Sequence, residues 1–128
     1  MVVDTSVLLA VFFEEIHYQW AIEQMNHHAQ ELRMSTVNLT ETLIRLRDRQ
    51  PQLFTDIEEK LLYSGIRFIH PDIQQAQFAA EARLRFPLNL GDCFAYALAI
   101  QEGCPILTLD KDFLILDHKI IHPTSSLL

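Results

Sequence analysis

The chain has few residues that would interrupt or cross-link a fold. Its 128 residues include only three glycines, five prolines and two cysteines, while 49% of them are hydrophobic. This composition argues against a disordered chain and fits a single compact domain over residues 1–128. Cys93 and Cys104 lack the spacing of metal ligands, so we expect reduced thiols, with Cys93 a buried structural residue rather than a nucleophile.

Several common functional motifs are also missing. There is no glycine-rich phosphate loop, which excludes nucleotide hydrolysis of the P-loop type, and we interpret Gly65, Gly91 and Gly103 as turn or cap residues. The six histidines form no paired metal-binding motif, so we interpret them as surface residues. The apolar run 7–13 follows no basic stretch and is too short to cross a bilayer. We therefore expect no signal peptide, no membrane span and a cytoplasmic protein.

The charge of the chain is negative, at −7, with 17 acidic residues against 10 basic ones. Such an excess disfavours a nucleic-acid partner, because contacts to phosphates need lysine and arginine. Divalent cations in an acidic site would change this balance, since each would bring positive charge to the place where a phosphate would lie. Composition therefore leaves RNA and DNA open as substrates.

Helix and strand patterns alternate along the whole chain, which is typical of an α/β domain with a mostly parallel sheet. We predict strands at 1–3, 32–36, 66–69 and 106–109, a short edge strand at 119–121 and a tail at 122–128. We predict a first helix that begins at Thr5 or Ser6. Further helices are predicted at 15–30, 38–49, 52–63, 72–85 and 89–102. The expected fold is a central sheet of four to five strands flanked by helices.

Two of these helices carry predictions about single residues. Asn38 precedes an amphipathic stretch that runs to Arg49, and we predict that it is the N-cap of this helix. In the helix 72–85, apolar side chains recur at the spacing of one helix face, which supports the prediction of this helix. The face consists of Ile73, Ala76, Ala80 and Leu84.

Four carboxylates follow apolar segments that are predicted strand ends or helix starts: Asp4, Glu41, Asp92 and Asp110. In an open parallel sheet, side chains at the carboxyl ends of the strands meet in one crevice. Carboxylates gathered there would repel one another by about 4 kcal/mol per close pair at an effective dielectric near 20. Such a cluster needs cations to neutralise it.

Each of these acids also has an ordinary alternative role. The segments 38–41 and 89–92 both resemble capping boxes, in which an acidic side chain helps to satisfy free backbone N–H groups. Asp4 and Asp110 could be simple helix-entry residues after strands. Capping does not require acids at successive sites that the topology brings together, whereas binding of divalent cations does. The joint pattern therefore favours a metal site.

Mg²⁺ and Mn²⁺ are the cations that suit such a site, because they prefer oxygen ligands and are commonly held by a few carboxylates with substrate phosphates. Asp112 follows Asp110 by two residues and could reach the same ion, or it could cap the next segment. The hydroxyls of Thr5 and Ser6 could bind a phosphate at a helix start, or they could act as N-caps.

Basic residues lie on the helix that follows Glu41. Arg45, Arg47 and Arg49 could contact RNA phosphates beside an acidic crevice, or they could form a solvated helix face. Of these we select Arg45, with Thr5 and Ser6, as candidate substrate-binding residues. Contacts to phosphates would position a strand without reading its sequence.

Four segments together resemble a known family. The sequences at 2–6, 35–41, 88–97 and 107–113 are similar, in the right order and over nearly the whole chain, to those of the PIN-domain nucleases. The resemblance is strongest to the VapC-type toxins of bacterial toxin-antitoxin pairs. Any one of these segments is a weak motif, whereas the four together are quite specific.

The resemblance implies a PIN fold and an endoribonuclease that depends on Mg²⁺ or Mn²⁺. It implies that Asp4, Glu41, Asp92 and Asp110 form the metal and catalytic site, with Asp112 as a further acid. It also implies a homodimer and inhibition by a small antitoxin protein, of which one segment enters the acidic cleft.

Two rival interpretations stay open. A phosphotransfer or phosphatase domain also places acids at strand ends, but its dehalogenase-like form needs a second aspartate where this chain has Ser6. A catalytically inactive PIN scaffold would only bind a protein partner and would not cleave RNA. The carboxylates of the candidate site are all present, which disfavours this second rival.

Overall fold

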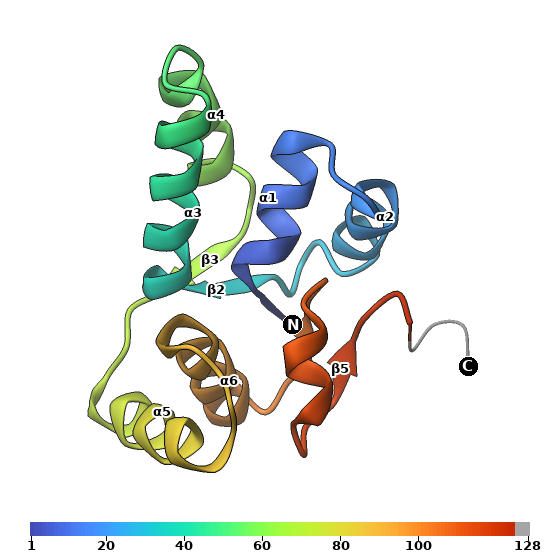
Figure 1. The fold of residues 1–128 in the computed structure, drawn as a ribbon. Helices are drawn as coiled ribbons and strands as arrows, with labels where there is room; N and C mark the ends of the chain where they lie inside the picture. Colours follow the sequence, from blue (N-terminus) through green and yellow to red (C-terminus); the bar gives the residue numbers. More distant parts are fainter. Residues whose placement is uncertain (125–128) are drawn as a thin grey trace.

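The computed structural model describes residues 1–124, and its helices and strands alternate as the sequence predicts. The elements in chain order are β1 (Val2–Val3), α1 (Thr5–Phe13), α2 (Tyr18–His27), β2 (Arg33–Ser35), α3 (Thr36–Arg49), α4 (Phe54–Leu62), β3 (Arg67–Ile69), α5 (Ile73–Arg85), α6 (Leu90–Glu102), β4 (Ile106–Leu107), the 3₁₀-helix η1 (Lys111–Ile115) and β5 (Ile120–Ile121). Figure 1 shows this arrangement. The α/β fold with a central parallel sheet is confirmed.

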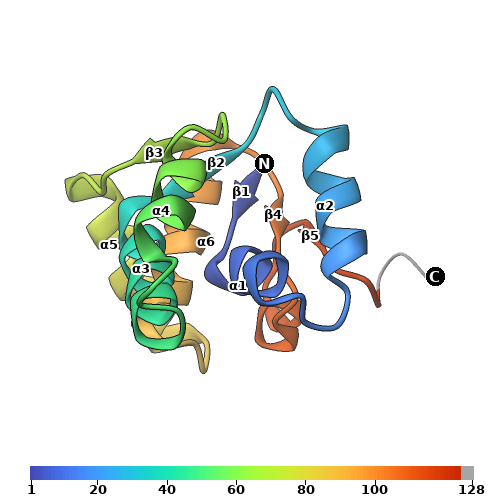
Figure 2. The ribbon, with the colours of Figure 1, turned by 90° about the horizontal axis from the view of Figure 1, so that it is seen from above.

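The five strands form one sheet in the order β3-β2-β1-β4-β5, which Figure 2 shows from above. All neighbouring strands are parallel, and Val2 of β1 lies opposite Arg33 of β2 and Ile106 of β4. Parallel neighbours need a crossover connection, which the helices provide. Because β1 is central, the residues that follow β1, β2 and β4 emerge at the same edge of the sheet.

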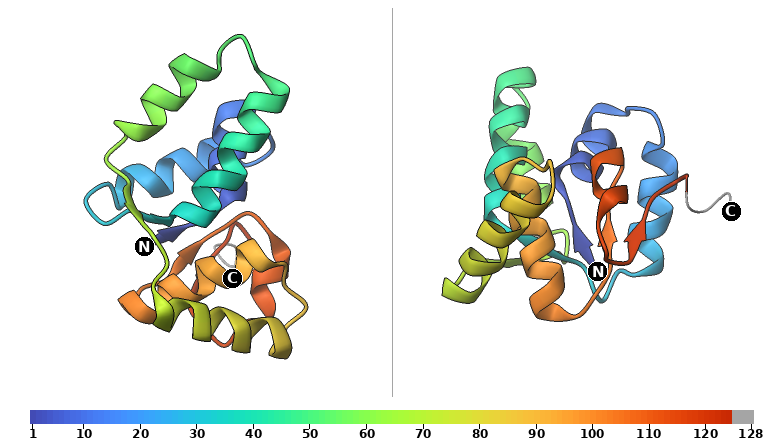
Figure 3. Two further views of the ribbon diagram at one scale, coloured as in Figure 1. Left: turned by 90° about the vertical axis from the view of Figure 1, so that its left-hand side faces the viewer. Right: turned by 60° about the horizontal axis from the view of Figure 1, so that its bottom comes forward.

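The strands are short, and the neighbouring strands β1 and β4 are buried on both faces. Val2 belongs to a hydrophobic cluster with residues of α5 and α6, whereas the next residue, Val3, belongs to a second cluster with residues of α1 to α4. Ile106 and Leu107 of β4 alternate in the same way, as the two-residue period of a strand requires. The left panel of Figure 3 shows α5 and α6 on one side of the sheet and α3 and α4 on the other.

Asn38 is not an N-cap, so this prediction is wrong. The helix α3 begins at Thr36, directly after β2, and the cap is Ser35, whose Oγ accepts the backbone N–H of Val37 at 3.2 Å. Asn38 is the third residue of the helix and only 1% exposed. Its amide is therefore free for a different task, which the site below defines.

The helix predicted at 72–85 is confirmed as α5, but the apolar stripe that supported this prediction lies on its exposed side. Ile73 and Leu84 are 81% and 89% exposed, whereas Gln75, Ala79 and Ala82 are buried. The helix carries two overlapping apolar stripes, and periodicity alone does not say which of them meets a neighbour. The buried stripe packs with the α6 residues of the first cluster.

The helix predicted at 15–30 is shorter, because the turn after α1 extends to His17 and α2 covers only Tyr18–His27. Two other predictions concern buried residues. Cys93 is fully buried, as expected, but His122 is only 4% exposed, so the prediction of a surface residue is wrong for this histidine. Its Nδ1 accepts the backbone N–H of Thr124 at 3.0 Å, and its Nε2 lies 3.3 Å from the carbonyl oxygen of Leu109. The predicted tail therefore begins with a packed residue, and its residues 125–128 lie outside the described part of the chain.

Within residues 1–124, no helix combines the length and the apolar character that crossing a membrane requires.

Candidate metal centre

The four carboxylates selected from the sequence line a single cavity of about 390 Å³. Asp4 follows β1, Glu41 lies in the first half of α3, Asp92 lies in the first turn of α6 and Asp110 follows β4. They come from four separate segments, and the parallel sheet and the starts of α3 and α6 bring them together. Acidic side chains thus converge where the topology predicts.

Asp4 is held by three hydrogen bonds. Its Oδ1 accepts the backbone N–H and the hydroxyl of Ser6 at 2.8 and 2.6 Å, and its Oδ2 accepts the hydroxyl of Thr108 at 2.6 Å. Burial raises the pKa of Asp4 to about 6, and the negative charge of Asp110 adds to the rise, while the bonds from Ser6 and Thr108 oppose it. Asp4 is thus a buried acid whose charged form the fold only partly stabilises.

Thr108 is a site residue that the sequence interpretation missed. It is fully buried, and besides donating to Asp4 it accepts the backbone N–H of Asp110 at 2.9 Å. Ser6 makes a matching link, because its Oγ accepts the backbone N–H of Leu109 at 2.9 Å. These bonds tie the ends of β1 and β4 together and fix Asp4 relative to Asp110. The sequence feature that could have identified Thr108 as a site residue is its position at the end of a predicted strand, two residues before Asp110.

We expect Thr108→Val to lower the free energy of unfolding by about 2 kcal/mol at pH 7, because the buried Oδ2 of Asp4 loses its donor while Oδ1 keeps the two hydrogen bonds from Ser6. Urea unfolding would measure the loss. The matched control is Thr42→Val, which removes another fully buried hydroxyl that donates only to the backbone carbonyl of Asn38 at 2.8 Å. Equal losses for the two variants would contradict a special role of Thr108.

Glu41 is held at one oxygen only. Its Oε1 accepts the Thr5 hydroxyl at 2.9 Å and the Nδ2 of Asn38 at 2.9 Å. Within residues 1–124, its Oε2 accepts no hydrogen bond. The hydroxyls of Thr5 and Ser6 therefore contact carboxylates of the site, which is a third role beside the two left open by the sequence.

Asp92 has the most unusual environment of the four acids. It is 8% exposed, and its Oδ2 is buried without a hydrogen-bond partner among residues 1–124. Burial raises the pKa of Asp92 to about 7, with further contributions from the negative charges of Asp4, Asp110 and Glu41. A buried, unpartnered carboxylate oxygen among other acids is a position that a cation would stabilise.

The capping alternative holds for two of the acids. Asp4 caps α1, and Asp110 caps η1 by accepting the backbone N–H of Asp112 at 2.9 Å. At α6 the geometry is that of the capping box: Asn89 is the N-cap and accepts the backbone N–H of Asp92 at 2.8 Å, and a hydrogen bond from the Asn89 backbone lowers the pKa of Asp92. Glu41 is too far along α3 to cap it. Capping therefore explains neither Glu41 nor the buried Oδ2 of Asp92.

A set of three acids has the spacing of cation ligands. Carboxylate oxygens of Asp92, Asp110 and Asp112 all lie within 4.8 Å of one another, and Asp112 is exposed beside the other two. All the candidate ligand atoms are carboxylate oxygens, which suits Mg²⁺ or Mn²⁺ better than softer metals. The unpartnered Oδ2 of Asp92 and this set together fit a divalent cation.

Of the three arginines considered on α3, only Arg45 lines the cavity. The Arg49 guanidinium lies 3.7 Å from the centre of the Phe13 ring and 3.6 Å from a carboxylate oxygen of Glu15. Arg47 lies over another aromatic ring, that of Phe54, at 4.2 Å. Their guanidinium groups thus contact side chains of their own protein, and Arg45 is the remaining candidate for a phosphate contact.

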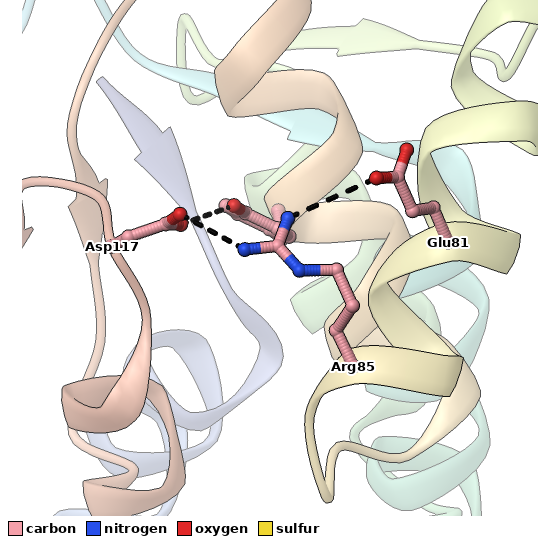
Figure 4. Close-up of polar contacts among 4 residues, drawn as sticks. Glu81, Arg85 and Asp117 are labelled. Carbon is pink, nitrogen blue, oxygen red and sulfur yellow. Dashed lines mark hydrogen bonds and ion pairs between the residues drawn. The ribbon is translucent and has the colours of Figure 1, made fainter.

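A cluster of polar side chains holds the segment that follows η1 in the chain (Figure 4). Asp117 accepts the Tyr96 hydroxyl at 2.6 Å and the Arg85 guanidinium at 3.1 Å, and Arg85 also lies 3.9 Å from Glu81. Burial, followed by the contact with Asp117, raises the pKa of Tyr96 to about 12. The segment that carries Asp110 and Asp112 is therefore fixed at both ends, by Thr108 and by Asp117.

Comparison with known proteins defines the class to which this fold and site belong. The family model described as PIN domain matches residues 1–119, and the chain belongs to the PIN domain family.

Within that family, the chain is similar over its full length to proteins named as VapC ribonucleases. Ribonuclease VapC42 of Mycobacterium tuberculosis is 32% identical over 133 aligned residues, which cover 96% of this chain and 98% of the relative. Ribonuclease VapC of Mycolicibacterium smegmatis is 30% identical, over 95% of this chain and 100% of the relative.

Solved structures show the same fold. The VapC20 toxin of Mycobacterium tuberculosis, described as cleaving the sarcin-ricin loop, has a TM-score of 0.78 at 19% identity, over 91% of this chain and 95% of that one.

Proposed function

We propose that this protein is an endoribonuclease that depends on Mg²⁺ or Mn²⁺, and the toxin of a toxin-antitoxin pair. It would act in the cytoplasm as a single domain over residues 1–128. The observation that carries this proposal is the convergence of Asp4, Glu41, Asp92 and Asp110 on one cavity. Membership of the PIN family and full-length similarity to VapC ribonucleases support it.

We assign cation binding to Asp4, Glu41, Asp92 and Asp110, with Asp112 as a further acid. A bound divalent ion supplies positive charge and Lewis acidity for an in-line displacement at phosphorus. The protein contributes the fixed placement of these acids, through the hydrogen bonds that hold Asp4 and Glu41. Arg45, at the wall of the cavity, would contact a phosphate of the RNA strand.

The geometry disfavours the phosphotransfer rival. Both oxygens of Asp4 accept hydrogen bonds, from Ser6 and Thr108, so this carboxylate is not poised as a free nucleophile. A phosphotransfer domain would form an aspartyl phosphate with acetyl phosphate, whereas we expect none here.

The partners follow from the same proposal. VapC ribonucleases are relatives of this chain. The antitoxin expected for it would be a small protein of which one segment enters the acidic cavity. The homodimer that the resemblance implies stays a prediction, and sedimentation of the purified chain would test it.

Purified protein incubated with total cellular RNA is expected to cleave it with Mg²⁺ or Mn²⁺ and not with a chelator. The Asp4→Asn variant should be inactive, because a buried neutral amide replaces one of the cation ligands. The products would be separated on a denaturing gel. Cleavage that persists in the chelator, or in Asp4→Asn, would contradict a metal-dependent nuclease at this cavity, and absence of any cleavage would favour the inactive scaffold.

A further inference from the structure

Asn38 joins two helices at the wall of the cavity. The Nδ2 of Asn38 donates to Oε1 of Glu41 at 2.9 Å and to the backbone carbonyl oxygen of Gly91 at 3.0 Å. Glu41 lies one turn away on the same helix, α3, whereas Gly91 is the second residue of α6. One buried amide group thus connects the glutamate to the start of the helix that carries Asp92.

The chemistry of the partners fixes the orientation of this amide. A carboxylate and a carbonyl are both acceptors, so only the NH₂ group of Asn38 can face them. Its Oδ1 is buried and has no partner among residues 1–124. A buried polar atom without a partner destabilises the fold. We infer that the two hydrogen bonds donated by the NH₂ group stabilise the fold by more than the unpartnered Oδ1 destabilises it.

Gly91 leaves the space in which Glu41 lies. A Cβ atom built at Gly91 would meet the whole Glu41 carboxylate: Oε2 would be its nearest neighbour, and Cδ and Oε1 would both lie 2.5 Å away, which is closer than such atoms approach unless the glutamate moves. The backbone of Gly91 is not in the left-handed region, so conformation does not require glycine here. Its interpretation as a turn or cap residue is wrong, because Gly91 is buried inside α6 beneath the glutamate.

We propose, on the basis of the nuclease function proposed above, that Asn38 and Gly91 are positioning residues that set the Glu41 carboxylate at the start of α6, next to Asp92. Asn38 holds Oε1 from one side together with the hydroxyl of Thr5, and Gly91 provides the surface on which the carboxylate lies. The second oxygen, Oε2, then remains available for a cation. Groups that orient ligands in this way typically change metal affinity by about 10- to 100-fold when they are removed.

Two variants test the proposal by independent routes. Asn38→Leu keeps a similar side-chain shape but removes both N–H donors and the orphaned oxygen. Gly91→Ala adds the Cβ that would displace Glu41, while alanine favours a helix more than glycine does by about 1 kcal/mol. Mn²⁺ binding to the purified full chain, without RNA, would be measured by calorimetry alongside thermal unfolding.

We expect each variant to bind Mn²⁺ at least about 10-fold more weakly than the natural chain while it still unfolds cooperatively. Adding either change to Glu41→Gln should weaken Mn²⁺ binding little further, because both act through Glu41. The control is Gln75→Leu, which removes a buried amide of α5 that bonds Gln101 at 2.6 Å, away from the cavity. Its Mn²⁺ affinity should be unchanged.

Natural Mn²⁺ affinity in both Asn38→Leu and Gly91→Ala would overturn the positioning role and leave the nuclease proposal intact. A full additional loss in the double variants with Glu41→Gln would also overturn it. If the natural chain bound no Mn²⁺ and cleaved no RNA, the proposed function itself would fail, and the positioning role with it.

Discussion

Replacement of Asp92 by asparagine should reduce RNA cleavage by at least about 100-fold and, at the same time, make the cation-free protein more stable. Both effects arise from the same oxygen. In the described part of the chain the buried Oδ2 has no hydrogen-bond partner, and it lies among other acids, so in the absence of a cation its negative charge destabilises the fold. With the charge removed, the site loses a ligand and the fold loses a repulsion.

The size of the stability gain follows from the raised pKa of Asp92, which is about 7. We expect about 2 kcal/mol at pH 8, less than the full shift in pKa would give, because asparagine also needs partners when it is buried. Thermal unfolding in a chelator would measure the gain. Asp48→Asn, on the exposed face of α3, is the control and should change neither activity nor stability. An active Asp92→Asn variant, or one that is less stable than the natural chain in a chelator, would contradict this account.

The second large effect concerns pH and Mg²⁺. Asp4 and Asp92 have pKa values of about 6 and about 7 in the folded protein, against an ordinary value of 3.8. An acid whose pKa is raised by folding binds more protons in the folded state, so its contribution to stability is full at low pH and is lost as the pH rises. Without a divalent cation, the free energy of unfolding should therefore fall between about pH 4 and pH 7.

Mg²⁺ should reverse this trend, because it binds only the ionised carboxylates and so stabilises the folded state most at high pH. At one fixed Mg²⁺ concentration, about 10-fold above the dissociation constant measured at pH 8, we expect the increase in melting temperature to be clear at about pH 8 and nearly absent at about pH 5. Differential scanning calorimetry across this range, with and without a chelator, would measure it. An increase that does not depend on pH would indicate that Mg²⁺ binds elsewhere. Asp92→Asn should lose most of the response.

Much of the architecture was accessible from the sequence. The alternation of helices and strands and the acids beyond their ends were sufficient to predict a parallel sheet and a crevice that gathers Asp4, Glu41, Asp92 and Asp110. This worked because parallel topology forces strand ends to one edge, so that the positions of residues along the chain translate into positions in space.

The parts that failed depend on contacts between segments distant in the sequence. Asn38 looked like a cap because its type and spacing are those of a cap, but β2 runs directly into α3 and Ser35 takes that role. Gly91 looked like a turn residue because nothing local reveals that Glu41, 50 positions earlier, lies against it. Thr108 was missed because the partner of its hydroxyl, Asp4, is separated from it by 104 positions.

The order of the strands has a consequence for protein synthesis. The central strand, β1, is made before both of its neighbours in the sheet, and one of these, β4, is made after β2 and β3. A growing polypeptide that has not yet reached residue 106 therefore lacks Asp110, β4 and the Thr108 hydroxyl that donates to Asp4. Products of translation that stop before residue 106 cannot assemble the acidic cavity, and any activity that depends on it begins only after residue 110 has been made.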